Sequence, residues 1–193
     1  MDVVEFIERL NLFDLLVVFF VATFFVVGFI QGALRRALGL AIALLSLLVA
    51  LNLRDPLGAW LAQYWTHLAR PYVEMLALGG SFLTIYIAGS ITIQTFYRRT
   101  TLFAKATVVD ELIGGTLGAL QALLLVGAVI LILDSHYAQP GTPADPNELA
   151  ILRDIFNFYN ASQVVDLFRA SLIPLFFALL GWIVPSDLAT RYR

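Results

Sequence analysis

The chemistry that this chain could perform depends first on four acidic residues at the edges of long apolar stretches: Asp14, Glu74, Asp110 and Asp134. A carboxylate inside a membrane segment is costly and commonly marks an ion or proton site. Each of the four nevertheless lies near the end of its stretch, where capping a helix or facing water explains it equally well. The sequence therefore leaves a transport role open beside a structural role, which we favour.

Other catalytic chemistry finds little support in the residue types. The chain has no cysteine, which excludes disulfides, thiolate catalysis and cysteine-type zinc sites. His67 and His136 are far apart and do not have the spacing of metal ligands, so we predict no metal and no cofactor. Ser81, Ser90 and Tyr86 have no recognisable base partner. We therefore expect no enzyme, and an intramembrane enzyme is the least favoured alternative.

The composition predicts an all-α integral membrane protein. Hydrophobic residues make up 60% of the 193 residues, against about 45 to 50% in soluble domains, and they are concentrated in long runs. The net charge is −2 and no basic cluster is present, so we expect no nucleic-acid partner. The predicted architecture is a polytopic bundle of four transmembrane helices with interfacial amphipathic helices.

The first apolar run is long enough to cross a membrane twice. It extends over roughly forty residues, which as a helix would measure about 60 Å, twice the ~30 Å hydrocarbon core of a bilayer. Its interruption runs from Gly28 to Arg36, where glycines permit close packing and Arg35 and Arg36 cannot enter lipid. We therefore predict a hairpin with spans at residues 12 to 30 and 37 to 53.

Two further spans are predicted at 72 to 96 and 112 to 133. Between the second and third spans, an apolar stripe with Trp60, Tyr64 and Trp65 predicts an interfacial helix over 56 to 69, because Trp and Tyr favour the membrane interface. One side of the third span is polar, which predicts helix packing or, as the alternative, a substrate path. Its polar residues are Ser81, Thr84, Tyr86, Ser90, Thr92, Gln94 and Thr95.

The chain divides into three predicted parts. Residues 1 to 11 form an N-terminal interfacial segment, and residues 12 to 134 form the four-span membrane domain. Residues 135 to 193 contain an external loop, a short amphipathic helix and a final helix whose uncharged core spans 170 to 184 and contains Pro174. Because this core is shorter than the ~20 residues of a usual span, we expect it to be re-entrant or interfacial, with a fifth crossing as the alternative.

The distribution of basic residues predicts the orientation in the membrane. Arg35 and Arg36 lie in the hairpin turn, and Arg98, Arg99 and Lys105 lie in the loop between the third and fourth spans. Loops rich in Arg and Lys remain in the cytoplasm. We therefore expect both loops inside and the N-terminus outside.

Two motifs carry a family resemblance. The segment from Asp14 to Leu38 resembles the N-terminal signature of the colicin V production protein family, CvpA, and the acid followed by spaced glycines at 110 to 121 resembles its second block. The glycines at i and i+4 also predict close helix packing, and more weakly dimerisation. The residues of these motifs are Asp14, Gly28, Gly32, Arg35, Asp110, Gly114 and Gly118.

The resemblance implies a multi-pass protein of the bacterial inner membrane. It further implies a link to toxin production or export and to envelope homeostasis, without an established enzymatic activity. We therefore expect a membrane scaffold or accessory factor whose partners are membrane lipid and a second copy or another membrane protein, with a small transporter or channel as the alternative. The chain departs from the family pattern at Gln31, Ala33 and Arg36, and the last of these stands where the family tends to carry an acid.

Overall fold

The computed structural model describes residues 11 to 96, 107 to 138 and 147 to 185. In these ranges the chain is helical and contains no strand, which confirms the all-α prediction. The helices are α2 (Leu12–Gln31), α3 (Ala33–Leu61), α4 (Arg70–Phe96), α5 (Thr107–Tyr137), α6 (Ala150–Asn160), α7 (Gln163–Leu167), the π-helical segment η1 (Phe168–Leu172) and α8 (Ile173–Leu180). The N-terminal segment predicted over 1 to 11 falls almost wholly outside the described residues.

Helices α2 and α3 form the predicted hairpin, and a single residue separates them. Gly32 has φ +82°, the only positive φ in the described ranges, and a glycine adopts this conformation without the strain that a Cβ would cause. Because the turn is so short, α3 begins at Ala33 rather than at the predicted residue 37. Arg36 therefore belongs to the helix and is buried, whereas Arg35 is partly exposed.

Helix α3 is longer than its predicted span and continues through Pro56 to Leu61. The prediction placed a break at Arg54 because a charge was expected to leave the membrane domain. The structure instead buries Arg54 beside Glu74 of α4, with 3.1 Å between Nη2 and Oε2. No single helix therefore covers 56 to 69: Trp60 lies in the last turn of α3, and the exposed Tyr64 and Trp65 lie in the turns that follow.

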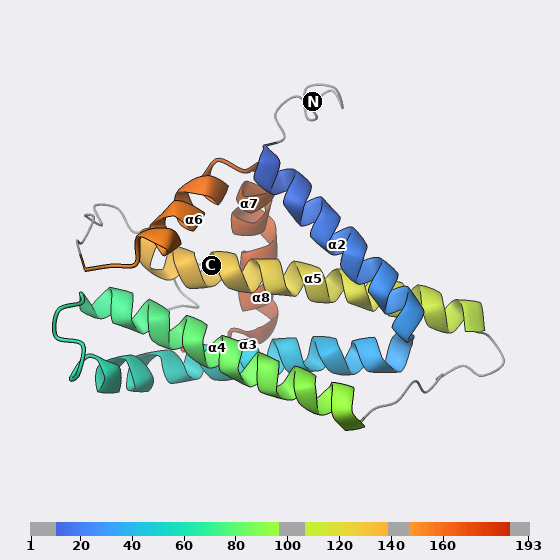
Figure 1. The fold of residues 1–193 in the computed structure, drawn as a ribbon, viewed down its shortest axis with the longest axis horizontal. Helices are drawn as coiled ribbons and strands as arrows, with labels where there is room; N and C mark the ends of the chain where they lie inside the picture. The colour runs from blue at the N-terminus through green and yellow to red at the C-terminus, as the bar shows by residue number, and fades with distance from the viewer. Residues whose placement is uncertain (1–10, 97–106, 139–146, 186–193) are drawn as a thin grey trace.

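Helices α3, α4 and α5 lie side by side, and α2 packs obliquely across α5 (Figure 1). Their shared core lies between α3, α4, α5 and the C-terminal helices. Its largest fully buried side chains include Leu51, Met75, Phe82, Tyr159 and Phe177. The core therefore joins the first and last parts of the described chain into one packed unit.

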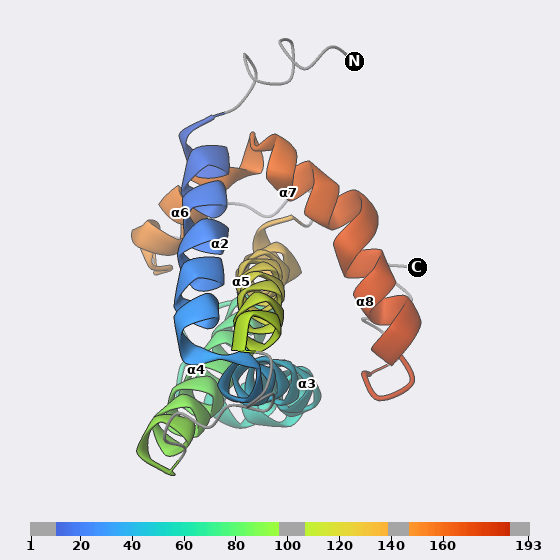
Figure 2. The ribbon, with the colours of Figure 1, turned by 90° about the vertical axis from the view of Figure 1, so that its right-hand side faces the viewer.

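The C-terminal helices add a fifth candidate span, which was the alternative to the predicted four. Among the residues that the structure describes, five helices, not four, are long and apolar enough to cross a membrane, and the fifth is the continuous helical segment Gln163–Leu180. Pro174 does not end it: this residue lies directly after the π-helical segment Phe168–Leu172, and the helix continues through it to Leu180. The segment runs across α3 and α5 rather than alongside them (Figures 1 and 2).

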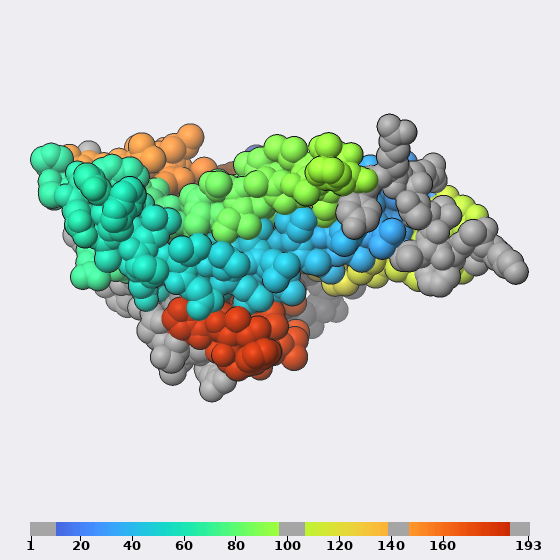
Figure 3. All heavy atoms as spheres, turned by 90° about the horizontal axis from the view of Figure 1, so that it is seen from below, coloured from blue at the N-terminus to red at the C-terminus, as the bar shows by residue number. Residues whose placement is uncertain are grey.

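The outer surface of the bundle is rich in large apolar side chains. Phe19, Leu83, Ile91, Leu120 and Leu179 are among those that are exposed, and they belong to four helices, α2, α4, α5 and α8. Figure 3 shows the molecule from below, with α3 and α4 side by side and α8 projecting beside α3. A soluble protein does not expose apolar surface on this scale, and lipid is the medium in which it is stable.

Candidate functional site

The glycines of the two sequence motifs lie against each other where α2 crosses α5. A Cβ placed on Gly114 would come within 2.7 Å of the backbone carbon of Gly32, and a Cβ on Gly118 would overlap the carbonyl oxygen of Phe24. Gly28 is in similar contact with the backbone of Gly114. The absence of side chains therefore lets the two helices touch through their backbones, and this face is occupied within one chain.

Asp110 completes this contact at the hairpin turn. The residue is almost fully buried, and its Oδ2 would lie 2.6 Å from a Cβ on Gly32. Gly32 is thus required both for its positive φ and for the space that the carboxylate fills. Five of the seven motif residues, Gly28, Gly32, Asp110, Gly114 and Gly118, meet in this region.

A polar cavity of about 520 Å³ lies next to the turn, bordered by α2, α3, α4 and α5. Arg36 donates from Nη1 to Oε1 of Gln121 at 3.0 Å, and Gln121 donates from Nε2 to the hydroxyl of Tyr86 at 3.1 Å. The Arg36 guanidinium also lies over the ring of Phe24. Part of the polar side predicted for the third span, including Ser90 and Gln94, lines this cavity.

Asp14 is fully buried and connects the start of α2 with the start of α7. It closes a capping box with Asn11 at the start of α2, and its Oδ1 accepts a hydrogen bond from the Ser162 hydroxyl and one from the Val164 backbone N–H. The Ser162 hydroxyl in turn caps α7 by accepting from the N–H of Val165. One carboxylate therefore serves the N-termini of two helices.

Asp134 pairs with Arg169, the charged residue of the π-helical segment. Arg169 donates from Nε and Nη2 to the two carboxylate oxygens, at 2.7 and 2.8 Å, which is a bidentate geometry. The hydroxyl of Tyr159 donates to the same carboxylate at 2.9 Å. Burial, and then the nearby Asp134 carboxylate, raise the pKa of Tyr159 far above its ordinary value. Its hydroxyl therefore remains protonated and a donor.

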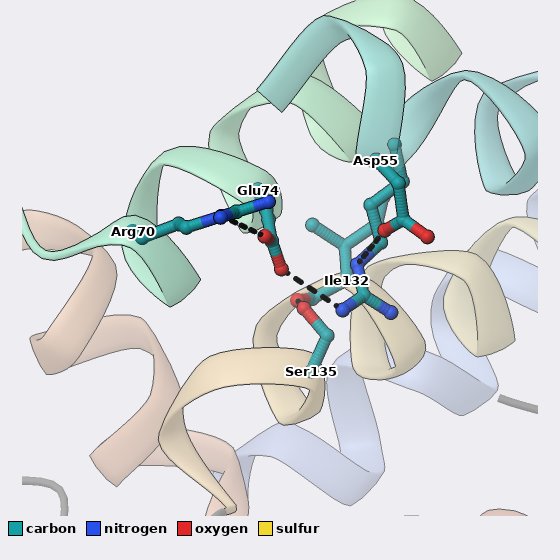
Figure 4. A network of polar contacts seen from close by, with 6 residues as sticks. Asp55, Arg70, Glu74, Ile132 and Ser135 are labelled. Carbon is teal, nitrogen blue, oxygen red and sulfur yellow. Dashed lines mark hydrogen bonds and ion pairs between the residues drawn. The ribbon is translucent and has the colours of Figure 1, made fainter. Parts of the chain in front are cut away.

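Glu74 lies near the start of α4, between two arginines (Figure 4). Its Oε1 accepts from Nε of Arg70 and its Oε2 accepts from Nη2 of Arg54, each at 3.1 Å. Asp55 is also 3.5 Å from Nε of Arg54. The charge of Arg54 is thus paired with acids of α3 and α4.

Sequence reasoning missed three parts of these networks. Gln121 and Arg169 were not singled out, and Arg36 was expected in the hairpin turn rather than inside the bundle. An arginine within an apolar helix is itself a signal for an internal partner. Arg98, Arg99 and Lys105, which were predicted to set the topology, lie outside the described residues.

The described residues hold no group of three or more His, Asp or Glu side chains placed to bind a metal ion. The buried acids Asp14, Glu74 and Asp134 instead contact groups of the same chain, while many large apolar side chains are exposed on the outer surface. This arrangement, with several helices long enough to span a bilayer, defines a multi-pass α-helical membrane protein.

The family follows from the comparison with known families. The model described as "Colicin V production protein" matches residues 13–174, and the chain belongs to this family. This match confirms the resemblance seen in the two glycine motifs. Neither a curated protein nor a solved structure matched the chain.

Proposed function

We propose that the protein is a non-enzymatic accessory or scaffold protein of the bacterial inner membrane. Its role would be in colicin V-type toxin production or export and in envelope homeostasis, as its family suggests. The observation that carries the proposal is that the buried acids face groups of the same chain. Asp14 binds Ser162, Asp134 binds Arg169, and Glu74 binds Arg54.

The same observation weakens the alternative of a small transporter or channel. A carboxylate that carries ions or protons must exchange its partner during the transport cycle. Asp14 instead caps two helices, and Asp134 is buried and held in a bidentate pair with Arg169. The roles that these contacts support are packing of the bundle and presentation of its apolar outer surface to lipid and to other membrane proteins.

The accessory role predicts a loss of toxin export without a loss of toxin synthesis. In a bacterium that secretes a colicin V-type toxin and depends on this protein, deleting its gene should lower extracellular toxin activity at unchanged intracellular toxin. A plasmid copy should restore secretion. The measurement is a growth-inhibition assay on culture supernatant and on lysed cells.

The transport alternative is tested in parallel. Purified protein in lipid vesicles should give no proton, sodium or potassium flux above that of empty vesicles. If the wild type gave a flux that Asp14→Asn and Asp110→Asn abolish, transport and not the accessory role would be the function. Normal secretion from the deletion strain would remove the link to toxin export.

We also propose that the α2–α3 turn faces the cytoplasm and that the turns after α3 face outward. The turn carries Arg35 and the loop after α4 carries Lys105, and the positive-inside rule favours the cytoplasm for both. The end of α3 and the start of α4 lie together at the opposite end of the bundle (Figure 1). Tyr64, between them, is exposed and therefore accessible to a reagent.

This orientation predicts opposite labelling of two single-cysteine variants in a chain without native cysteine. In intact spheroplasts a membrane-impermeant maleimide should label Tyr64→Cys at once. Lys105→Cys should react only after permeabilisation. The reverse pattern would place the arginine-rich turn outside and reject the orientation.

A further inference from the structure

The cavity beside the hairpin turn contains two arginines and no acid. Arg35 and Arg36 both line it, together with Tyr86, Ser90, Gln94 and Gln121 as its main polar residues. None of the described residues that line it is Asp or Glu. Among these residues the cavity therefore has two positive charges and no negative charge in its lining, between membrane helices.

Arg36 differs in this respect from the other arginines inside the bundle. Arg54 is paired with Glu74, and Arg169 is paired with Asp134. Arg36 is only 8% exposed, yet it makes no ion pair with any residue that the structure describes, and its Nε has no hydrogen-bond partner there. A buried charge without a counter-charge is strongly unfavourable. An anion from outside the chain would remove this cost.

The arrangement of the site holds the guanidinium in one orientation. Gln121 accepts from Arg36 through its oxygen and uses its amide nitrogen to donate to Tyr86. The ring of Phe24 covers the guanidinium from α2. Side chains from four helices thus fix a donor group that has hydrogen-bonding capacity left, which is the condition for binding an oxyanion.

The cavity also fits the apolar part of a lipid. Helix α2 packs mainly on α5, and α4 mainly on α3, and in Figure 2 both α2 and α4 lie on the same side of the α3–α5 pair. Ile87 and Ile91 of α4 line the cavity and are also exposed on the outer surface. The site is close to the turn, where lipid phosphates lie if α2 and α3 cross the membrane. Acyl chains can therefore lie along α4 while the phosphate reaches the arginines.

We propose that this cavity binds the phosphate group of an anionic membrane lipid, with Arg36 as the principal ligand and Arg35 as a second cation. The proposal goes beyond the accessory role and does not depend on it. The bound lipid supplies the negative charge that the protein lacks there.

Native mass spectrometry of the purified protein tests this with phosphatidylglycerol and with diacylglycerol of the same chains. The wild type should retain one phosphatidylglycerol preferentially and should not retain diacylglycerol. Arg36→Gln should lower the apparent affinity about tenfold or more, because a hydrogen-bonded charge contributes about 1.5 to 3 kcal/mol. Arg36→Lys should lose less.

Two further variants separate binding from folding. Arg70→Gln removes a charge that is 69% exposed at the far end of α4 and should leave lipid retention unchanged. Ser90→Phe fills the cavity from α4 without altering an arginine and should reduce retention as Arg36→Gln does. Circular dichroism of each variant shows that the helices have formed.

Three results would overturn the proposal. The first is equal retention of phosphatidylglycerol by the wild type, Arg36→Gln and Ser90→Phe. The second is equal retention of diacylglycerol and phosphatidylglycerol by the wild type. The third comes from an arm with inorganic phosphate: displacement of the lipid at a phosphate concentration comparable with that of the lipid would show that the site recognises free phosphate instead.

Discussion

Gly118→Ala is expected to destabilise the protein, although alanine is the better helix former. In an exposed helix position the exchange gains about 1 kcal/mol. At position 118 the new methyl group overlaps the Phe24 carbonyl oxygen, which belongs to the backbone and cannot rotate away. Helix α2 must therefore move off α5. Overpacking of this kind costs about 1 to 3 kcal/mol, and thermal unfolding in detergent should show a lower midpoint than for the wild type.

Gly80→Ala is the matched control because Gly80 also lies within a long apolar helix. A Cβ on Gly80 meets nothing within 4 Å, so this variant should keep or slightly raise the unfolding midpoint. The difference between the two variants isolates the α2–α5 contact from helix propensity and from detergent effects. Equal midpoints for Gly118→Ala and Gly80→Ala would mean that the helices are not in backbone contact there.

Hydropathy was sufficient to find the four longest helices, since each corresponds to an apolar run that only a membrane helix can accommodate. The ends were predicted less well. Prediction placed the start of the second helix after Arg36 and its end before Arg54, on the assumption that charges leave the membrane. The structure keeps both arginines within α3, because Arg54 is paired with Glu74 and Arg36 lines the cavity beside the turn.

The glycine motifs indicated close packing, and the structure shows which helices they join. Sequence spacing places Gly114 and Gly118 on one face of a helix, but it does not say whether that face meets α2 or a second copy of the chain. The structure places it against α2. Partners of the whole protein therefore have to bind through other surfaces than this one.

The polar networks could not be derived from the sequence, because they join residues that are far apart in the chain. Asp14 and Ser162 are separated by 148 positions, and Arg36 and Gln121 by 85. Asp14 and Asp134 were recognised at helix ends, yet their partners Ser162 and Arg169 depend on how α6 to α8 fold back on the bundle. Arg169 was overlooked because a single arginine beside a short apolar core looks like the edge of that core.

Arg169→Met should be among the most destabilising single exchanges in the chain. It removes the cation from Asp134, whose side chain is only 2% exposed, and leaves a buried carboxylate with Tyr159 as its remaining described donor side chain. Breaking a buried pair in this way costs about 3 to 5 kcal/mol. The unfolding midpoint in detergent should fall more than for Gly118→Ala, and hydrogen exchange should increase over residues 163 to 180, because this pair ties η1 to α5.

The double variant Asp134→Leu with Arg169→Met shows whether the unpaired charge of Asp134 causes the destabilisation by Arg169→Met. Removing both charges leaves no uncompensated carboxylate, so the double variant should be more stable than Arg169→Met alone. Arg70→Met serves as the control, since the ion pair of Arg70 with Glu74 is at the surface and is worth about 0 to 1 kcal/mol.

If Arg169→Met were as stable as Arg70→Met, the C-terminal helices would be held by apolar packing alone. If the double variant were the least stable of the three, the pair would act through its hydrogen-bond geometry rather than through charge compensation.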